Sequence, residues 1–335
     1  MIPKMIMSIF KRTVHLLLAL ALCVSFAGCA GRNVIYKREN TIVLSDEDSD
    51  EEQASMLPNV TQSATLEPGE TAGPENTNTY KFTGEAFCII NASTGEIVLS
   101  DNAYEINYIA SITKILTCLV ALEWVEPDEK IRLESGWLDV LKKDQSIECY
   151  GLKEGSSYYV KDMVSMALVK SLGDAAVALG KIAESRSGIA FEELMNEKAS
   201  ELGMTASSFD NPIGLDIGNN YTKNYSTAYD ATKLLAAALT DETIMSAVSG
   251  KTVYLTNGVE MKNPCSLLTN GSGSDNYTML GGKTGSTKAA GSCLTVAAQN
   301  RNNGDIYVVV YLHGSNATVV INEIKTMLEY ICVNS

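Results

Sequence analysis

The sequence predicts an α/β domain built on a mainly antiparallel sheet, and three observations carry this prediction. Strand-like runs begin near residue 84 and return after residue 277, while helical periodicity fills most of the region between them. The late strands follow one another through short turns, as antiparallel strands do. Strands at both ends with helices in the middle indicate one intertwined domain, with the central helices grouped separately.

Residues 1–28 resemble an export signal of the lipoprotein type. Lys11 and Arg12 precede an apolar run that is too short for a comfortable membrane span. This run ends in "FAGC", in which small residues stand immediately before Cys29. We therefore expect a mature chain that starts at Cys29 and is lipid-anchored to the extracytoplasmic face of a bacterial cell membrane. The alternative is an ordinary signal peptide with a chance cysteine.

Residues 29–79 are expected to form an acidic disordered tether before a folded domain at 80–335. The stretch 45–79 contains nine acids, no Lys or Arg and no aromatic residue, and it is rich in Pro, Thr, Asn and Ser. Such a composition cannot bury enough apolar surface to order itself. We interpret the acidic run as solvated, with no need of a metal.

The folded part opens with a predicted hairpin and a buried helix. Residues 84–102 alternate as two strands around a Ser93-Thr94-Gly95 turn. A helix that is apolar on almost every side begins near Ser111, and a helix of this kind is expected to be buried. Residues 130–160 are mixed, with turns at the glycines.

Further helices are predicted at about 161–170, 174–185 and 190–202. Another begins at "STAYDATKLL", where Thr227 and Asp230 resemble a capping box. Asn257-Gly258 predicts a two-residue hairpin turn. Strands follow at about 278–285, 291–299 and 305–314, and a final helix runs from about 317 to 331.

Composition excludes several kinds of chemistry. The formal net charge is −14, which argues against a nucleic-acid partner because binding there depends on basic side chains. The chain has two histidines, His15 in the predicted signal and His313, so multi-histidine metal sites are excluded. Six cysteines remain beyond the signal and Cys29, and we expect mostly free, buried thiols.

One candidate catalytic pair stands at the start of the apolar helix. Ser111 and Lys114 are three residues apart and therefore share one helix face. An amine in apolar surroundings has a lowered pKa, and a neutral lysine beside a serine is a general base beside a nucleophile. The competing interpretation is a lysine that extends to water from the helix end.

Two segments further along the chain favour the catalytic interpretation. The segment "IASITK", which contains Ser111 and Lys114, is followed by "VKSLGDAAVALG" and then by "GGKTGSTKAAGSCL". They resemble the S-x-x-K, S-x-N and K-T-G motifs of penicillin-interacting serine enzymes. The blocks between them resemble D-alanyl-D-alanine carboxypeptidases, the low-molecular-mass penicillin-binding proteins, over about residues 84–332. The resemblance implies a β-lactamase/DD-peptidase-like fold, with a five-stranded antiparallel sheet flanked by helices and a helical subdomain.

The resemblance also implies roles for the motif residues. Ser111 attacks the D-Ala-D-Ala end of a peptidoglycan stem peptide, Lys114 accepts its proton, and Ser171 relays a proton to the departing D-alanine. Lys283 and Thr284 bind the substrate carboxylate, and Gly285 lets the substrate approach the strand. The resemblance further implies that backbone N–H groups of Ser111 and Ser286 form the oxyanion hole, that no cofactor is needed and that β-lactams acylate Ser111.

The sequence departs from the family pattern in two places. The second motif reads Ser171-Leu172-Gly173, so its asparagine is missing, and "LHGSNATVVINEIKTML" lacks an arginine that relatives use for the carboxylate. We expect a weakened or altered site. Two alternatives therefore stay open: a degenerate, non-catalytic muropeptide- or penicillin-binding protein, and a β-lactamase, whose E-x-x-L-N motif "FEELMNE" matches only with the wrong spacing.

Overall fold

A computed structural model describes residues 41–45, 77–143, 147–214, 224–269 and 274–335. The predicted signal peptide and Cys29 lie outside the described residues, as does 46–76. Residues 1–34 and residues 35–335 form two separate units, and only the second is described below. Within the described residues, no helix has the length and apolar character needed to cross a bilayer.

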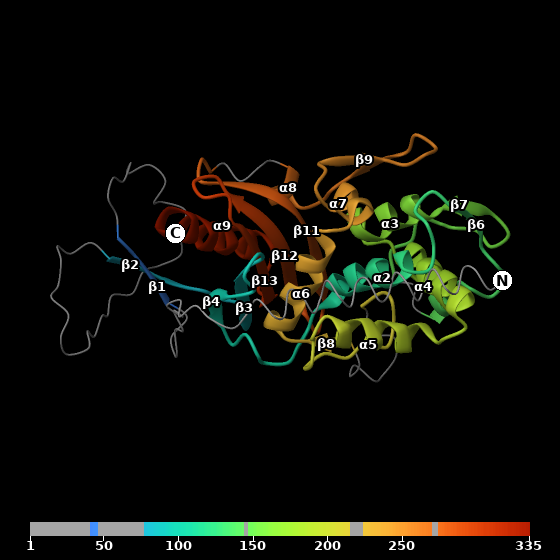
Figure 1. The fold of residues 1–335 in the computed structure, drawn as a ribbon, viewed down its shortest axis with the longest axis horizontal. Coiled ribbons are helices and arrows are strands. Elements are labelled where there is room, and N and C mark those ends of the chain that lie inside the picture. Colours follow the sequence, from blue (N-terminus) through green and yellow to red (C-terminus); the bar gives the residue numbers. More distant parts are fainter. Residues whose placement is uncertain (1–40, 46–76, 144–146, 215–223, 270–273) are drawn as a thin grey trace. The chain divides into compact units, whose positions relative to one another are not determined.

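The second unit is built on a five-stranded antiparallel sheet, as predicted (Figure 1). Its strands, in spatial order, are β11 (Tyr277–Thr287), β12 (Gly291–Asn300), β13 (Ile306–Gly314), β3 (Ala86–Asn91) and β4 (Ile97–Asp101). The early hairpin therefore pairs with the last strand of the chain. This pairing leaves β11, which carries the third motif, as an edge strand.

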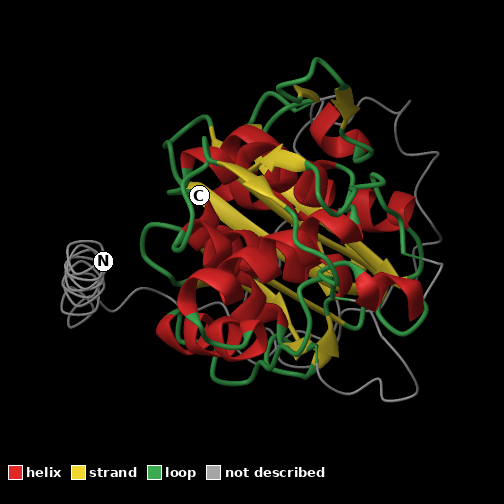
Figure 2. Ribbon diagram, turned by 90° about the vertical axis from the view of Figure 1, so that its right-hand side faces the viewer, coloured by secondary structure: helices red, strands yellow, loops and turns green. Residues whose placement is uncertain are grey.

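Helices cover both faces of the sheet and form a separate group beside β11 (Figures 1 and 2). They are α2 (Thr113–Leu122), α3 (Val160–Val169), α4 (Gly173–Ser187), α5 (Phe191–Glu201), α6 (Ala228–Ala238), α7 (Glu242–Val248), α8 (Ser266–Thr269) and α9 (Ala317–Asn334). The predicted helices at 161–170, 174–185, 190–202 and 317–331 are confirmed within a few residues.

Both faces of β13 are buried, which explains its continuous apolar sequence. Val308, Val310 and Leu312 join the core shared with the central helices, whereas Tyr307, Val309 and Tyr311 join a second core under α9. α6 packs on β13 and β3 from one side, and α9 packs on β12 and β13 from the other. The sheet is therefore a rigid support for the motif on β11.

Small strands complete the described fold. They are β1 (Thr41–Ser45), β2 (Thr77–Lys81), β5 (Asn107–Tyr108), β6 (Lys130–Arg132), β7 (Ser157–Tyr159), β8 (Tyr225–Ser226), β9 (Thr252–Tyr254) and β10 (Glu260–Lys262). β1 pairs with β2 in an antiparallel two-stranded sheet. Both strands overlap the range 29–79 that was expected to form a tether, and "TIVLS" is rich in β-branched residues, which favour strands.

Two turn predictions need correction. The β9–β10 connection is not a two-residue Asn257-Gly258 turn: Gly258 N–H donates to the Leu255 carbonyl at 2.8 Å, which makes Thr256 and Asn257 the central residues. Gly258 follows them with φ +83°, the left-handed residue of a three-residue loop. At α6 only half of the capping box forms, since Thr227 caps the N–H of Asp230 while the Asp230 carboxylate bonds elsewhere.

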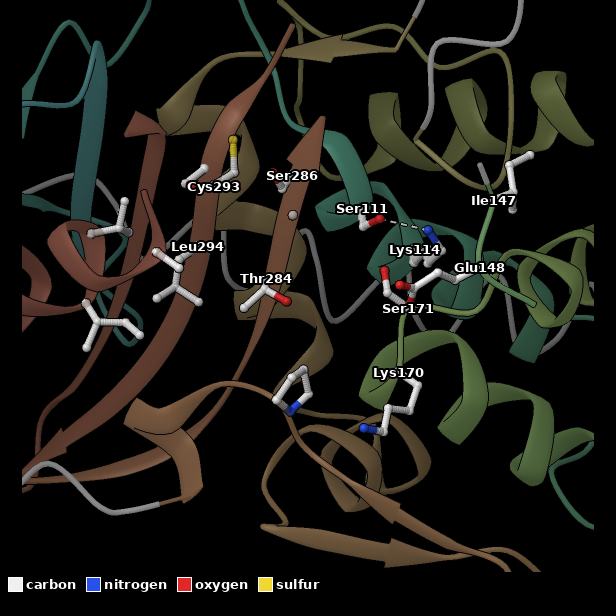
Figure 3. Close-up of a pocket in the computed structure, with 16 residues that line it drawn as sticks. Ser111, Lys114, Ile147, Glu148, Lys170, Ser171, Thr284, Ser286, Cys293 and Leu294 are labelled. Carbon is white, nitrogen blue, oxygen red and sulfur yellow. Dashed lines mark hydrogen bonds between the residues drawn. The ribbon is translucent and has the colours of Figure 1, made fainter. Parts of the chain in front are cut away.

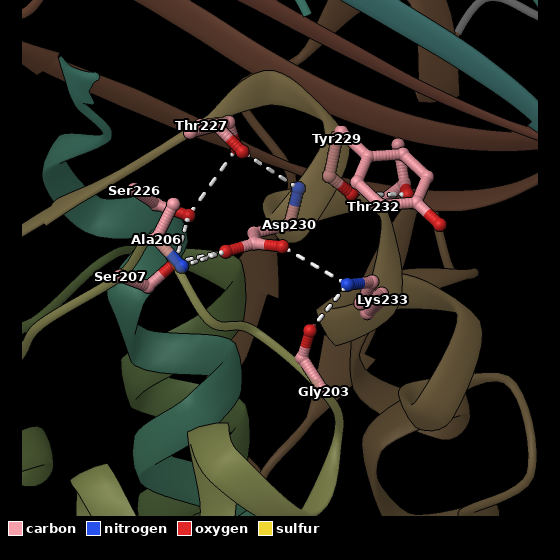
Figure 4. A network of polar contacts seen from close by, with 9 residues as sticks. All are labelled: Gly203, Ala206, Ser207, Ser226, Thr227, Tyr229, Asp230, Thr232 and Lys233. Carbon is pink, nitrogen blue, oxygen red and sulfur yellow. Dashed lines mark hydrogen bonds and ion pairs between the residues drawn. The ribbon is translucent and has the colours of Figure 1, made fainter. Parts of the chain in front are cut away.

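The Asp230 carboxylate links α6 to the segment that follows α5 (Figure 4). It accepts hydrogen bonds from the Ala206 N–H and the Ser207 hydroxyl, both at 2.9 Å, and pairs with Lys233 at 2.9 Å. Asp230 is buried. A buried carboxylate needs such partners, so this network fixes α6 against residues 203–207.

The cysteine prediction is confirmed for the described residues. All six described cysteines are free, and five are buried, while Cys149 is exposed. Burial raises the pKa of the Cys118 and Cys293 thiols. These thiols behave as small apolar side chains in the core.

Candidate active site

Ser111 lies in a short 3₁₀ turn, η2 (Ala110–Ile112), that leads directly into α2. The α-helix proper starts at Thr113, two residues later than the predicted start. Ala110 has φ +46°, a left-handed conformation that is uncommon for a residue with a side chain. Strain of this kind persists where surrounding structure holds it, and it orients the serine at the start of the helix.

Lys114 reaches Ser111 as the i, i+3 spacing predicts. Its Nζ lies 2.8 Å from Ser111 Oγ and donates to the Ile213 carbonyl at 2.7 Å. The side chain is 1% exposed, so it does not extend to water. Burial first, and then the charge of Lys283, hold the Lys114 pKa well below its usual range. Burial therefore favours the neutral amine, which is the form that can accept a proton.

A close approach between β11 and the η2 turn brings the first and third motifs together. A Cβ on Gly285 would lie 2.9 Å from the Ile109 carbonyl oxygen and 3.1 Å from the Ser111 nitrogen. We predicted that this glycine makes room for substrate at the strand edge. In the structure, the space that its missing side chain leaves is used by the turn that carries Ser111.

Ser171 and Lys283 connect the second motif to the third. Lys283 Nζ donates to Ser171 Oγ at 3.1 Å and to the Thr284 carbonyl at 2.7 Å. Burial lowers the pKa of Lys283 to about 8, so about nine tenths of the side chains remain cationic at pH 7. Ser171 itself has φ +61°, so the backbone on this side of the site is also strained.

These residues line one pocket of about 440 Å³ (Figure 3). Its walls include Ser111, Lys114, Ser171, Thr284, Gly285 and Ser286. Lys283 contacts this group from β11 through Ser171. The structure thus brings all the predicted catalytic and substrate-binding residues of the three motifs into one site. Cys29, the predicted lipid-anchor residue, lies outside the described residues.

The sequence reasoning missed several groups in and around this pocket. Ile147, Glu148 and Lys170 line it, and Ile213 contributes a backbone carbonyl to Lys114. Ile147 and Glu148 belong to an irregular segment without a recognisable motif, and a carbonyl acceptor leaves no signal in residue type. Lys170 stands immediately before Ser171 in the sequence, but the second motif assigns no role to this position.

Other residues considered from the sequence lie elsewhere. His313 stands at the end of β13, with Nε2 3.4 Å from Glu85, and it does not line the pocket. Asn196 of "FEELMNE" bonds to the backbone of Phe209, which is a structural role. Among the described residues, no cluster of His, Cys, Asp and Glu could hold a metal ion.

What the arrangement can do chemically follows from these contacts. A hydroxyl within 2.8 Å of a buried amine can lose its proton to that amine and attack an electrophilic carbon. A second hydroxyl, on Ser171, lies beside a cation that can orient an anionic group. This set of groups is suited to acyl transfer through a serine ester.

Comparison with known proteins agrees with this chemistry. Residues 73–313 match the family Peptidase S11, D-alanyl-D-alanine carboxypeptidase. The chain is 30% identical over 256 residues to the D-alanyl-D-alanine carboxypeptidase DacF of Bacillus subtilis, covering 73% of this chain and 62% of that protein. It is 30% identical over 254 residues to a D-alanyl-D-alanine endopeptidase of Escherichia coli, covering 71% of this chain and 76% of the relative. The match thus spans less than two thirds of the length of DacF.

Solved structures show the same fold. Penicillin-binding protein D2 from Listeria monocytogenes in its cefotaxime-bound form superposes with a TM-score of 0.62 at 24% identity, covering 75% of this chain and 98% of that one. A serine-to-alanine mutant of the Streptomyces K15 DD-transpeptidase gives a TM-score of 0.64 at 24% identity, covering 76% and 100%. The predicted fold class is therefore confirmed. From the family match and the curated relatives, the chain belongs to the peptidase S11 family of D-alanyl-D-alanine carboxypeptidases.

Proposed function

We propose that this protein is a serine-type DD-peptidase that removes the terminal D-alanine from peptidoglycan stem peptides and that is acylated by penicillin. One observation carries the proposal: the buried Lys114 amine lies 2.8 Å from the Ser111 hydroxyl, in a pocket that also holds Ser171. A fold-only relative would have no need to keep a desolvated lysine in contact with a serine, because burying an amine costs free energy.

Acylation begins when Ser111 Oγ attacks the carbonyl carbon of the penultimate D-alanine and passes its proton to Lys114. The peptide C–N bond then breaks, and the departing amine of D-alanine takes a proton by way of Ser171. The Ser111 ester is finally hydrolysed by water. Backbone N–H groups of Ser111 and Ser286 are the proposed oxyanion donors, and each such donor contributes about 3 kcal/mol to transition-state stabilisation.

Lys283 and Thr284 are the proposed binding groups for the terminal carboxylate of the substrate. Lys283 is mostly cationic at neutral pH, and β11, an edge strand of the sheet, contributes Thr284, Gly285 and Ser286 to the pocket wall. Penicillin offers a carboxylate and a reactive carbonyl in a similar arrangement. The same pocket would therefore accept both.

The central test is labelling with a fluorescent penicillin combined with D-alanine release from a stem pentapeptide. We expect stable labelling and release by the wild type, and loss of both in Ser111→Ala. Ser135→Ala, an exposed serine outside this pocket, is the matched control and should behave as wild type. Rapid turnover of the drug would instead indicate a β-lactamase, and absence of labelling would indicate a non-catalytic binding protein.

We further propose that Cys29 is lipid-modified and holds the protein on the extracytoplasmic membrane surface. The support is the sequence alone: basic residues, a short apolar run and small residues before the cysteine. Two acyl chains would bind firmly, since each buried methylene contributes about 0.8 kcal/mol. Cys29→Ala should release the protein from the membrane fraction, and unchanged retention would contradict lipid anchoring.

A further inference from the structure

The second motif has a glycine where relatives have asparagine, and another part of the chain occupies the space beside it. A Cβ built on Gly173 would lie 2.3 Å from Ile147 Cγ2 and 3.6 Å from the Glu148 carbonyl oxygen. No real Cβ makes a contact as short as 2.3 Å, so a side chain at 173 and the present position of Ile147 exclude each other. Ile147 therefore lies where a side chain at 173 would begin, and the Glu148 backbone lies in ordinary contact beside it.

The start of α4 holds this segment in place. The Gly173 N–H donates to the Glu148 carbonyl at 2.7 Å. The buried Asp174 carboxylate accepts three backbone N–H groups at 2.8–2.9 Å, from Tyr150, Gly151 and Leu152. The backbone of Glu148 is thus held by a hydrogen bond at its own carbonyl and by the hydrogen bonds of residues 150–152 to Asp174. Its backbone is pre-organised at the edge of the pocket.

The Glu148 side chain faces the catalytic groups. It lines the pocket with Ser111, Lys114 and Ser171, and Figure 3 shows it extending from its loop toward Ser171 and Lys114. Among the described residues, its carboxylate has no hydrogen-bond or ion-pair partner. Within the described part of the chain, the backbone around Glu148 is anchored by hydrogen bonds, whereas its carboxylate is not.

The reaction creates a need for a negative charge at this place. When Lys114 accepts the Ser111 proton, it becomes a buried ammonium with three N–H donors. The contacts of its Nζ are Ser111 Oγ and the Ile213 carbonyl. The charged or titratable groups that bear on it are Lys283 from β11, Cys118 from its own helix and Glu148. Lys283 opposes the new charge, and the Cys118 thiol stays neutral because burial raises its pKa.

We propose that Glu148 is a positioning residue that supplies the counter-charge for Lys114, in place of the side chain that Gly173 lacks. The inference rests on the proposed function for the role of Lys114, but not for the electrostatic contact itself. The direction agrees with the charges in the site: Glu148 raises the Lys114 pKa, against burial and Lys283. A general base is most effective when its pKa lies near the working pH. A carboxylate that limits the decrease in the Lys114 pKa therefore keeps Lys114 basic enough to accept the Ser111 proton.

The first readout is the titration of Lys114 by NMR in protein labelled with ¹³C at the lysine side chain, with the resonance assigned from Lys114→Arg. In Glu148→Gln we expect the Lys114 pKa to fall by about half a pH unit, the effect of one nearby charge that water partly screens. Glu148→Asp keeps the charge and should stay near wild type. Glu134→Gln removes an exposed carboxylate outside the pocket and is the matched control.

The second readout is the acylation rate with fluorescent penicillin. Glu148→Gln should lower the rate at the pH optimum about threefold or more, and Glu148→Asp should restore most of it. An unchanged Lys114 titration in Glu148→Gln would overturn the inference, and so would a shifted titration with an unchanged acylation rate. If the titration shifts but the wild type is never acylated, the proposed function fails while the charge contact stands.

Discussion

Replacing Lys283 with arginine should abolish the decline of the acylation rate above pH 8 while it keeps a positive charge at position 283. Lys283 is 2% exposed, and burial lowers its pKa from 10.5 to about 8. Above pH 8 the wild type therefore loses the charge that we propose binds the substrate carboxylate. Arginine remains protonated throughout this range because its pKa exceeds 12. The acylation rate of Lys283→Arg should then stay level where that of the wild type falls.

The size of the effect follows from the pKa. A shift from 10.5 to about 8 corresponds to about 3 kcal/mol against the charged form. At pH 9.5 only about one Lys283 side chain in thirty remains protonated, so the wild-type rate should be about thirtyfold below its plateau. The larger arginine will also strain a fully buried position, at a cost of about 1–3 kcal/mol. The shape of the pH profile, rather than its height, is therefore the result to compare.

The assay measures the second-order rate of labelling by a fluorescent penicillin between pH 6 and pH 10, with a blank for spontaneous hydrolysis and circular dichroism at each pH. Lys288→Arg changes an exposed lysine near the same motif and should reproduce the wild-type profile. The reasoning is refuted if the decline near pH 8 persists in Lys283→Arg, or if the wild type shows no decline below pH 10.

Four further outcomes are expected. Lys283→Met should unfold at a higher temperature than the wild type at pH 7, because burial makes the protonated Lys283 less stable in the folded state, where its pKa is about 8, than in the unfolded state. This advantage of Lys283→Met should shrink between pH 8 and pH 10.5, as Lys283 of the folded wild type loses its proton. Gly285→Ala should slow acylation at least tenfold, since its Cβ would meet the turn of the nucleophile at 2.9–3.1 Å. Asp230→Ala should lower the free energy of unfolding by about 3 kcal/mol, measured by urea denaturation, because buried donors lose their acceptor. Gly173→Asn should be destabilised by about 1–3 kcal/mol, and adding Ile147→Ala should restore part of that loss by removing the colliding methyl group.

The parts of the fold that could be predicted are those that depend on residues close together in the sequence. The strand runs, the central helices and the contact of Lys114 with Ser111 depend on spacings of two to four residues, which a sequence displays directly. The pairing of β13 with β3 joins segments about 220 residues apart, and the number of strands in the sheet was expected only through the family resemblance. No local pattern could have supplied that pairing.

The site was predictable where side-chain chemistry defines it and hidden where backbone geometry does. Ser111 and Lys114 were singled out by their i, i+3 spacing together with the family resemblance, and Lys283 was singled out by the resemblance alone. The Ile213 carbonyl and the position of Glu148 depend on which backbone atoms lie near α4 and α2, and irregular segments carry no periodic signal. Gly285 was expected to be a place of close approach, and in the structure the turn of the nucleophile makes such an approach, while Gly285 also lines the pocket.

Two lysines in one pocket must hold opposite protonation states at the same pH, and the structure explains how they can. Both are almost fully buried, but Lys283 keeps a pKa of about 8, whereas its positive charge adds to burial in lowering the pKa of Lys114. The proton on Lys283 therefore favours the neutral base beside Ser111. In the proposed mechanism, Lys114 becomes a second cation in the site once it has taken the Ser111 proton. Repulsion between the two cations would then favour transfer of that proton to the departing amine over its return to serine.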